Sequence, residues 1–305
     1  MPPLSPFNLR QWHRRSFLSG LLLAPFSLSS LIAGEHLPQS VTFLGSKKFE
    51  ALVRQAQQEK WRALPMGQRV ARFGLAMRGT PYVAYALEID DHVESPSVNF
   101  NGLDCWTFFE TALGLARMIQ TSRHVYTQAD LLREIDTTRY RGGVCRGNYL
   151  DRIHHLSEWF SDNEARGHVR DITRQLGPTQ VIKDRETNEM TLLWKSYRYL
   201  RNNPDLRPGM AKMEQQVGSR PFYYIPKNRV ADIEPKLQSG DIIGVVTDKS
   251  GTFCSHVGLA IRPEDGVLHF MHASATYKKV VMDKSLSEYL ADFGHHIGIA
   301  VARPI

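Results

Sequence analysis

The chemistry of this chain is concentrated at one cysteine and two histidines. A polar turn at residues 101–104 leads directly into an apolar helical stretch that begins with Cys105. Much later in the chain, His256 and His272 lie on two successive predicted strands. This order is typical of cysteine hydrolases, in which a thiolate attacks the substrate and an imidazole takes up the thiol proton. We therefore expect Cys105 to be the nucleophile, His256 the general base and His272 the group that orients the base.

The helix that begins at Cys105 is expected to activate its sulfur. Asp104 is a suitable N-cap for that helix. The positive end of the helix dipole and a nearby imidazole both favour the thiolate over the thiol. Backbone N–H groups of the first turn can also stabilise an oxyanion. The aromatic side chains of Trp106, Phe108 and Phe109 are expected to pack this helix and exclude water.

Zinc binding is the competing use of cysteine and histidine. A zinc site needs three or four ligands and usually contains a close pair, such as two cysteines separated by two residues. The sequence has no such cysteine pair, and its adjacent histidines at 154–155 and 295–296 would diverge on a helix or strand. We interpret these histidines as surface residues. We expect neither a metal nor a cofactor.

The elements that position these residues follow from hydrophobic periodicity. Helices are predicted over 47–64, 67–77, 105–119, 127–135 and 149–163, whereas 166–220 is ambiguous. Strands are predicted over 242–246, 256–261, 267–272, 279–282 and 297–302, with a helix over 285–292. Helices followed by an antiparallel sheet predict an α+β fold. The simplest organisation is one catalytic domain over 34–305, with an inserted region at about 139–235.

The first 33 residues have the pattern of a bacterial export signal. Arg14 and Arg15 precede a short apolar segment at 21–26, and a small residue follows at Ala33. The paired arginines indicate the twin-arginine type. The apolar segment is short and interrupted for a membrane anchor, and no other segment is longer. We therefore expect export by the twin-arginine machinery, cleavage near Ala33, and a periplasmic protein without a membrane span.

The overall charge does not indicate a nucleic-acid partner. The formal net charge is +7, and without the three arginines of residues 1–33 the chain has 35 basic and 31 acidic residues, or +4. This excess is too small for a nucleic-acid interface. A weakly basic surface suits an anionic polymer, but it also simply keeps a protein soluble.

The remaining two cysteines leave an open choice. Cys145 lies in a glycine-rich loop at 141–147, and Cys254 lies two residues before His256. In an oxidising compartment these two cysteines could form a disulfide that tethers the loop to the site. Two unpaired thiols are equally consistent with the sequence.

Five short motifs carry a family resemblance. They are Gly-Thr-Pro-Tyr at 79–82, Leu-Asp-Cys at 103–105, Gln-Ser-Gly-Asp at 238–241, Ser-His-Val-Gly at 255–258 and His-Ala-Ser at 272–274. In these motifs the chain resembles the NlpC-type cell-wall hydrolases. The resemblance implies a papain-like α+β fold, with nucleophile-bearing helices packed on a sheet that carries the histidines. It also implies a Cys105–His256–His272 triad that cleaves peptidoglycan amide bonds, with Tyr82 lying over the nucleophile.

One departure from the common pattern narrows the expected activity. The endopeptidase members have a serine after the cysteine, which helps to bind the free amine of L-alanine, whereas this chain has Trp106. Residues 104–110, 152–159 and 272–304 resemble instead an amidase-like branch first known as a domain of unknown function. That resemblance covers about 79–304 and implies an N-acetylmuramoyl-L-alanine amidase that favours small anhydro-muropeptides.

Cleavage beside the sugar requires a pocket for the lactyl-muramic acid group. We expect aromatic, cationic and polar contacts to substrate from Tyr82, Trp106, Arg152, Tyr224 and Ser255. Two alternatives remain open: a stem-peptide endopeptidase with the same fold, and a non-catalytic muropeptide-binding protein. A metal-binding periplasmic protein is a further class that metal analysis would expose.

Overall fold

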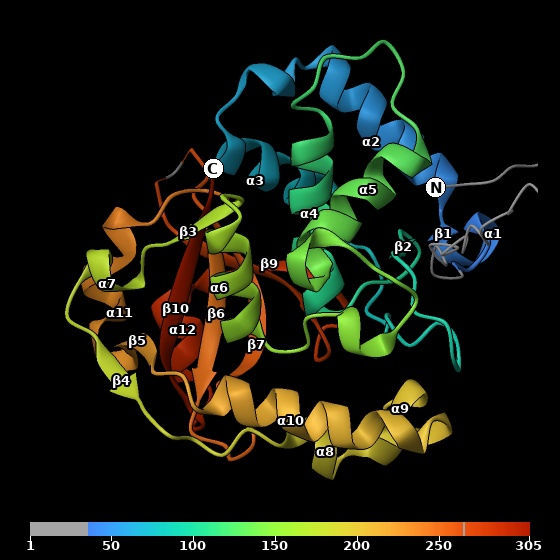
Figure 1. Cartoon of the computed structure of the whole chain (residues 1–305). Coiled ribbons are helices and arrows are strands. Elements are labelled where there is room, and N and C mark those ends of the chain that lie inside the picture. Colours follow the sequence, from blue (N-terminus) through green and yellow to red (C-terminus); the bar gives the residue numbers. More distant parts are fainter. Residues whose placement is uncertain (1–35, 265) are drawn as a thin grey trace, which may run out of the picture. The chain divides into compact units, whose positions relative to one another are not determined.

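The sheet that carries both histidines is built mainly from the last third of the chain. The computed structural model describes residues 36–264 and 266–305 (Figure 1). The predicted export signal at 1–33, with Arg14, Arg15 and Ala33, lies outside the described residues. The α-helices are α1 (Gln39–Thr42), α2 (Ser46–Gln58), α3 (Met66–Ala76), α4 (Cys105–Met118), α5 (Gln128–Arg139), α6 (Leu156–Ala165), α7 (Thr173–Leu176), α8 (Glu189–Leu192), α9 (Arg198–Asn202), α10 (Arg207–Gly218), α11 (Val230–Ile233) and α12 (Leu286–Ala291).

Short 3₁₀ turns and strands complete the described elements. The turns are η1 (Trp61–Ala63), η2 (Arg141–Gly143), η3 (Tyr149–Asp151), η4 (Trp194–Ser196), η5 (Pro204–Leu206), η6 (Lys227–Arg229) and η7 (Glu234–Lys236). The strands are β1 (Phe43–Leu44), β2 (Val98–Asn99), β3 (Val169–Asp171), β4 (Gln180–Ile182), β5 (Phe222–Pro226), β6 (Ile242–Thr247), β7 (Cys254–Ile261), β8 (His269–Ser274), β9 (Lys279–Ser285) and β10 (His296–Pro304).

The main sheet is antiparallel and has the order β4-β5-β10-β6-β7-β8-β9, with β3 also paired to β10. The prediction of an α+β fold with an antiparallel sheet is confirmed. The predicted strands β6 to β10 are present with small shifts at their ends. The last strand, β10, lies inside the sheet between β5 and β6, a position that periodicity does not reveal.

Both faces of the sheet are covered by helices. Since successive side chains along a strand point to opposite faces, each strand contributes to the core on both sides. On β10, Ala300 and Ala302 pack with the helices that precede the sheet, whereas Ile299 and Val301 pack with α7, α11 and α12. Figure 1 shows the sheet between these two sets of helices, with α4 on one side and α11 and α12 on the other. The sheet therefore has a rigid centre.

Helix α4 is the most enclosed element beside the sheet. It packs against α3, α5, β7 and β8, and the side chains of Phe108, Phe109 and Leu113 are fully buried. Burying one such side chain contributes about 1.5–3 kcal/mol to the free energy of folding. The predicted packing role of Phe108 and Phe109 is confirmed, and the first residue of α4 is held firmly.

One predicted helix is wrong at its start. The stretch 149–163 forms the turn η3, an extended segment at 152–155, and only then α6. The side chains of Arg152 and His155 are 3% and 7% exposed, although the periodicity would place them on an outer face. The backbone N–H of Ile153 donates to the carbonyl of Arg139 rather than to a helical neighbour. A buried ion pair and this contact hold the segment extended.

A small third core lies under the region that the sequence left ambiguous. Helices α8, α9 and α10 bury a cluster made by Tyr149, Met190, Tyr199, Leu200 and Met210. In Figure 1 these helices lie together at the lower edge, next to the strands of the sheet. None of the helices in the described residues is long and apolar enough to cross a membrane.

Candidate active site

A pocket of about 200 Å³ contains the predicted nucleophile and base. One part of its lining is Asp104, Cys105 and Trp106 from the start of α4, with Thr252 and residues 254–257 at the start of β7. We call the rest of the lining the pocket wall, which consists of Tyr85, Leu87, Glu88, residues 152–156, Glu189, Met190 and Tyr197. The structure therefore brings Cys105 and His256 to one cavity from segments far apart in the sequence.

Asp104 sets the position of Cys105. Its Oδ1 accepts a hydrogen bond from the backbone N–H of Thr107 at 2.8 Å, and the Thr107 hydroxyl accepts from the Asp104 backbone N–H at 3.0 Å. This capping box starts α4 at Cys105, as predicted. The second oxygen, Oδ2, accepts from the backbone N–H of Ala86 at 3.1 Å. One carboxylate thus joins the nucleophile helix to the pocket wall.

The Cys105 sulfur is a thiol rather than a ready-made thiolate. Burial raises the pKa of this half-buried thiol to about 12, and the Asp104 carboxylate acts in the same direction. Hydrogen bonds from the backbone of Val257, Trp106 and Cys105 itself lower the pKa but do not offset burial. The expected effect of the helix N-terminus is present in these backbone contacts, and burial outweighs it. Proton removal must therefore come from a base.

His256 and His272 form a direct pair. His256 Nε2 lies 2.7 Å from His272 Nδ1, across the neighbouring strands β7 and β8. Burial lowers the pKa of His256 well below its usual value, and the nearby His272 adds to this effect. Burial also lowers the pKa of His272. Both rings are therefore neutral near pH 7, which is the state that a general base requires.

A carboxylate that the sequence prediction missed stands behind this pair. Asp283 Oδ2 on β9 lies 3.3 Å from His272 Nε2. Asp283 directly follows the predicted strand 279–282, so an acid at the end of an apolar run was the available signal. Its significance depends on β9 pairing with β8, which only the fold provides.

Aromatic rings enclose the histidines. The ring of Phe270 stacks on His272 with centroids 4.9 Å apart and an interplanar angle of 15°, and Tyr289 from α12 lies 5.1 Å from His272. A Cβ on Gly258 would lie 2.4 Å from the Met271 carbonyl oxygen and 2.7 Å from the Phe270 ring. The glycine after the base is therefore required for this close packing.

Three of the predicted substrate contacts lie at or beside the pocket. Trp106 and Ser255 line it directly. Tyr82 pairs with Leu103 through an isolated β-bridge. Burial raises the pKa of the Tyr82 hydroxyl, and the negative charge of a thiolate at the nearby Cys105 raises it further. These three residues are available to contact a substrate.

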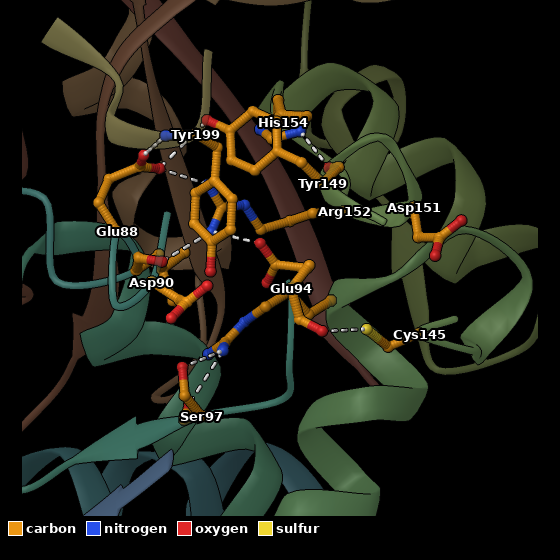
Figure 2. A network of polar contacts seen from close by, with 12 residues as sticks. Glu88, Asp90, Glu94, Ser97, Cys145, Tyr149, Asp151, Arg152, His154 and Tyr199 are labelled. Atoms are coloured by element: carbon orange, nitrogen blue, oxygen red, sulfur yellow. Dashed lines mark hydrogen bonds and ion pairs between the residues drawn. The ribbon is translucent and has the colours of Figure 1, made fainter. Parts of the chain in front are cut away.

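Arg152 lines the pocket, but its charge is used inside the protein. Its guanidinium lies 2.6 Å from Glu88 and 3.3 Å from Glu94, and it stacks over the Tyr149 ring at 4.6 Å. Figure 2 shows Arg152 between the two carboxylates, with Tyr199 beside it. The side chain is 3% exposed. The expectation of a free cationic contact is therefore corrected, because both of its charge partners are internal.

Tyr224 is also placed differently from the expectation. It is 8% exposed, packs in the main core and donates its hydroxyl to Gln180 Oε1 at 2.6 Å. It does not line the Cys105 pocket. The prediction of a substrate contact is wrong, because β10 and β6 both lie between β5 and β7, the strand that carries His256.

The histidines at 154–155 are not surface residues. His154 Nε2 lies 3.0 Å from the Tyr149 carbonyl oxygen, and His155 Nε2 lies 3.4 Å from Glu214 Oε1. Both line the pocket. Burial and the neighbouring Arg152 hold the pKa of His154 well below its usual value. The exposed His295, by contrast, pairs with Asp248 as a surface residue.

The cysteine question has a simple structural answer. Within the described residues, Cys105, Cys145 and Cys254 are all unpaired. Cys145 donates to the Glu94 carbonyl oxygen, whereas Cys254 lines the pocket. The same residues contain no group of three histidine, cysteine or acidic side chains arranged to hold a metal ion.

Further wall residues were not predicted. Glu189, Met190 and Tyr197 line the pocket from the region that the sequence left ambiguous. Tyr197 packs edge-to-face against Tyr85 at 6.0 Å, and Tyr85 has a positive φ of 56°. Glu214 on α10 fixes this side, since its carboxylate accepts from the backbone N–H groups of Met190 and Thr191. No local motif marks such a wall.

Residues 72–296 match the family model described as AmiA-like, N-acetylmuramoyl-L-alanine amidase-like. The chain belongs to this AmiA-like family. The match includes all of the pocket residues and both strands that carry the histidines. Among curated proteins, none matches the chain.

Solved structures agree with the AmiA-like assignment. An N-acetylmuramoyl-L-alanine amidase from Bacteroides uniformis is 30% identical with a TM-score of 0.71, and the alignment covers 79% of this chain and 99% of that one. A Bacteroides fragilis protein with a provisional xylanase name is 33% identical with a TM-score of 0.68, covering 76% and 98%. A Legionella pneumophila protein is similar in fold alone, at 21% identity and a TM-score of 0.60, covering 84% and 96%.

Proposed function

We propose that this AmiA-like protein is an exported, periplasmic cysteine amidase with an NlpC-type, papain-like arrangement. Its substrate would be the amide bond between N-acetylmuramic acid and L-alanine in peptidoglycan fragments. The observation that carries the proposal is the position of Cys105 at a capped helix start, in one pocket with His256 and its partner His272. Family membership supports the bond, and the three residues support the chemistry.

The first half of the reaction forms a thioester. His256 Nε2 is engaged by His272, so Nδ1 of His256 is the nitrogen that takes the proton from Cys105. The sulfur attacks the carbonyl carbon of the lactyl group, and backbone N–H groups at the start of α4 stabilise the oxyanion. His256 then returns the proton to the nitrogen of L-alanine as the C–N bond breaks. The peptide leaves with a free amine, and the muramoyl group remains on Cys105.

Water completes the reaction. It gives a proton to His256 Nδ1 and attacks the thioester carbonyl, and the C–S bond breaks. The sulfur takes up the proton again, which restores the thiol that burial favours. Trp106 and Ser255 line the pocket where the substrate would bind. No cofactor or metal takes part in these steps.

The dimensions of the pocket suit a fragment. A cavity of about 200 Å³ is small compared with the 300–1,000 Å³ typical of ligand sites. This small cavity is the basis for proposing a fragment as the substrate. The preference for anhydro-muropeptides implied by the amidase-like branch is part of the proposal.

Mass spectrometry of a defined substrate tests the proposal. An anhydro-muramoyl tripeptide and an intact sacculus digest would each be incubated with the protein and with Cys105→Ala. We expect free sugar and free L-alanyl peptide from the fragment, and no product with the variant. Cleavage inside the peptide would establish the endopeptidase alternative instead. If folded protein with a reduced thiol cleaves neither substrate, the amidase proposal fails and a binding role replaces it.

A further inference from the structure

The histidine pair ends on a carboxylate whose two oxygens have separate partners. Asp283 Oδ2 lies 3.3 Å from His272 Nε2, and Oδ1 accepts a hydrogen bond from the backbone N–H of Lys284 at 2.8 Å. The Asp283 side chain is only 10% exposed. These contacts fix the orientation of the carboxylate, so that one defined oxygen faces the histidine.

The direction of each hydrogen bond follows from this carboxylate. An ionised carboxylate only accepts, so His272 Nε2 must carry a hydrogen and donate it to Asp283. In a neutral imidazole the other nitrogen is then an acceptor, so His272 Nδ1 accepts from His256 Nε2 at 2.7 Å. The remaining nitrogen, His256 Nδ1, is left without a hydrogen. It is therefore the basic atom of the site.

We propose that Asp283 is a positioning residue that selects, through His272, the tautomer of His256 whose Nδ1 is free to take the Cys105 proton. The inference rests on the proposed function, because it assigns a role within the same reaction. Asp283 itself does not touch the substrate or the sulfur. It determines which nitrogen of His272, and through it which nitrogen of His256, carries the hydrogen.

The packing prevents the rings from reversing this order by rotation. His272 is 3% exposed and contacts both the stacked ring of Phe270 and the ring of Tyr289, which also contact each other. Rotation of the His272 ring would break its stacking on Phe270 and its contact with Asp283. The proton order can therefore change only when hydrogens move between nitrogens, and this is what Asp283 controls.

Other titratable groups near the pair do not replace Asp283. Lys284 pairs with Asp292 at 2.6 Å, so its charge is directed away. The ring of Tyr289 on α12 contacts both histidine rings, and burial raises the pKa of its hydroxyl. Burial likewise raises the pKa of the Cys105 thiol on α4. His296 on β10 lowers the pKa of His256 slightly further, with burial as the main cause. Asp283 is the carboxylate that contacts this pair in the described residues.

Two substitutions at one position separate tautomer control from mere packing. In Asp283→Asn, the atom that accepts from the Lys284 N–H must be the amide oxygen, so the NH₂ group faces His272 Nε2. This reverses both hydrogen bonds and places a hydrogen on His256 Nδ1. Asp283→Ala removes the preference without reversing it. We therefore expect kcat to fall by about 10³-fold in Asp283→Asn and by about 10-fold in Asp283→Ala, with KM unchanged in both.

Two readouts do not depend on the muropeptide substrate. The rate of Cys105 alkylation by iodoacetamide at pH 7 should fall in the same order as kcat. Nitrogen-15 spectra of labelled wild-type protein should show the hydrogen of His256 on Nε2, and Asp283→Asn should move it to Nδ1. Because these measurements need no amide cleavage, a failure of the proposed function leaves them valid as a separate test.

A matched carboxylate–histidine pair provides the control. Asp248 lies 2.9 Å from His295 Nδ1, but both side chains are more than half exposed and remote from the pocket lining. Asp248→Asn should leave kcat, alkylation and the His256 spectrum unchanged. The proposal is overturned if Asp283→Ala is as damaging as Asp283→Asn or more so. It is equally overturned if wild-type His256 carries its hydrogen on Nδ1, a measurement that requires no variant to fold.

Discussion

The two sides of the pocket are held in place by different forces. The catalytic side, formed by the start of α4 and by β7 and β8, belongs to the main core and to regular backbone hydrogen bonding. The pocket wall is irregular chain held by buried charges, with Arg152 between Glu88 and Glu94, and with Glu214 capping α8. Reactivity and pocket shape can therefore be damaged separately. Reactivity depends on elements held by apolar packing, whereas the shape of the pocket depends on internal ion pairs.

Removing the base should give the largest effect on the catalytic side alone. We expect His256→Ala to lower kcat by about 10²–10⁴-fold, because neutral His256 takes the proton that Cys105 does not release unaided. The melting temperature should change little in comparison. Steady-state kinetics and a thermal melt measure the two quantities. His295→Ala, at an exposed position, is the control.

Removing Arg152 should instead damage the wall through stability. Arg152→Ala leaves Glu88 and Glu94 buried beside each other without their cation. We expect a loss of about 3–5 kcal/mol in the free energy of unfolding. Urea denaturation measures it, with Arg198→Ala as the control, since solvent screens the exposed Arg198–Asp91 pair and its contribution is small. A loss no larger than that of the control would remove the distinction between the two sides.

The wall should also respond to pH through His154. Its pKa is lowered by burial and by Arg152, so the unfolded chain binds a proton near pH 6.5 that the folded protein does not. The resulting stability is fully present above pH 6.5 and decreases as the pH falls. The expected slope is at most about 1.4 kcal/mol per pH unit for this histidine. Unfolding at pH 7.5, 6 and 5 should show a smaller slope for His154→Gln, and the slope should be unchanged for the exposed His124→Gln.

The smallest expected effects distinguish two tyrosines. Tyr197 lines the pocket, so Tyr197→Ala should raise KM by about threefold to tenfold through the loss of ring contacts. Tyr224 lies in the core with its hydroxyl on Gln180, so Tyr224→Phe should leave KM unchanged. Its free energy of unfolding should decrease by about 1 kcal/mol. A change in KM for Tyr224→Phe would return that residue to the list of substrate contacts.

The same contrast explains what the sequence could predict. The helix α4 and strands β6 to β9 follow from local patterns: a capping box at Asp104 and apolar runs bounded by turns. The residues Cys105, His256 and His272 lie on those elements, so their proximity could be anticipated. The part of the site on these elements could be predicted because each element is determined by residues close to it in the sequence.

The wall could not be predicted in this way. Ile153, Leu156, Trp159 and Phe160 have helical spacing, yet the chain is extended before Leu156 because Arg152 pairs with carboxylates far away in the sequence. Asp283 could not be predicted for the same reason. Its role depends on β9 lying beside β8, and a single carboxylate in a strand does not reveal its neighbour. Long-range electrostatic partners are invisible to periodicity.

The central position of β10 has a consequence for how the protein is made. Strands β5 and β6 both pair with β10, so their inner edges have no partner until residues 296–304 have been synthesised. Unpaired strand edges are templates for aggregation. These two edges are therefore exposed to wrong pairing until the nine residues of β10 insert between them. Loss of β10 would open the middle of the sheet rather than remove one of its edges.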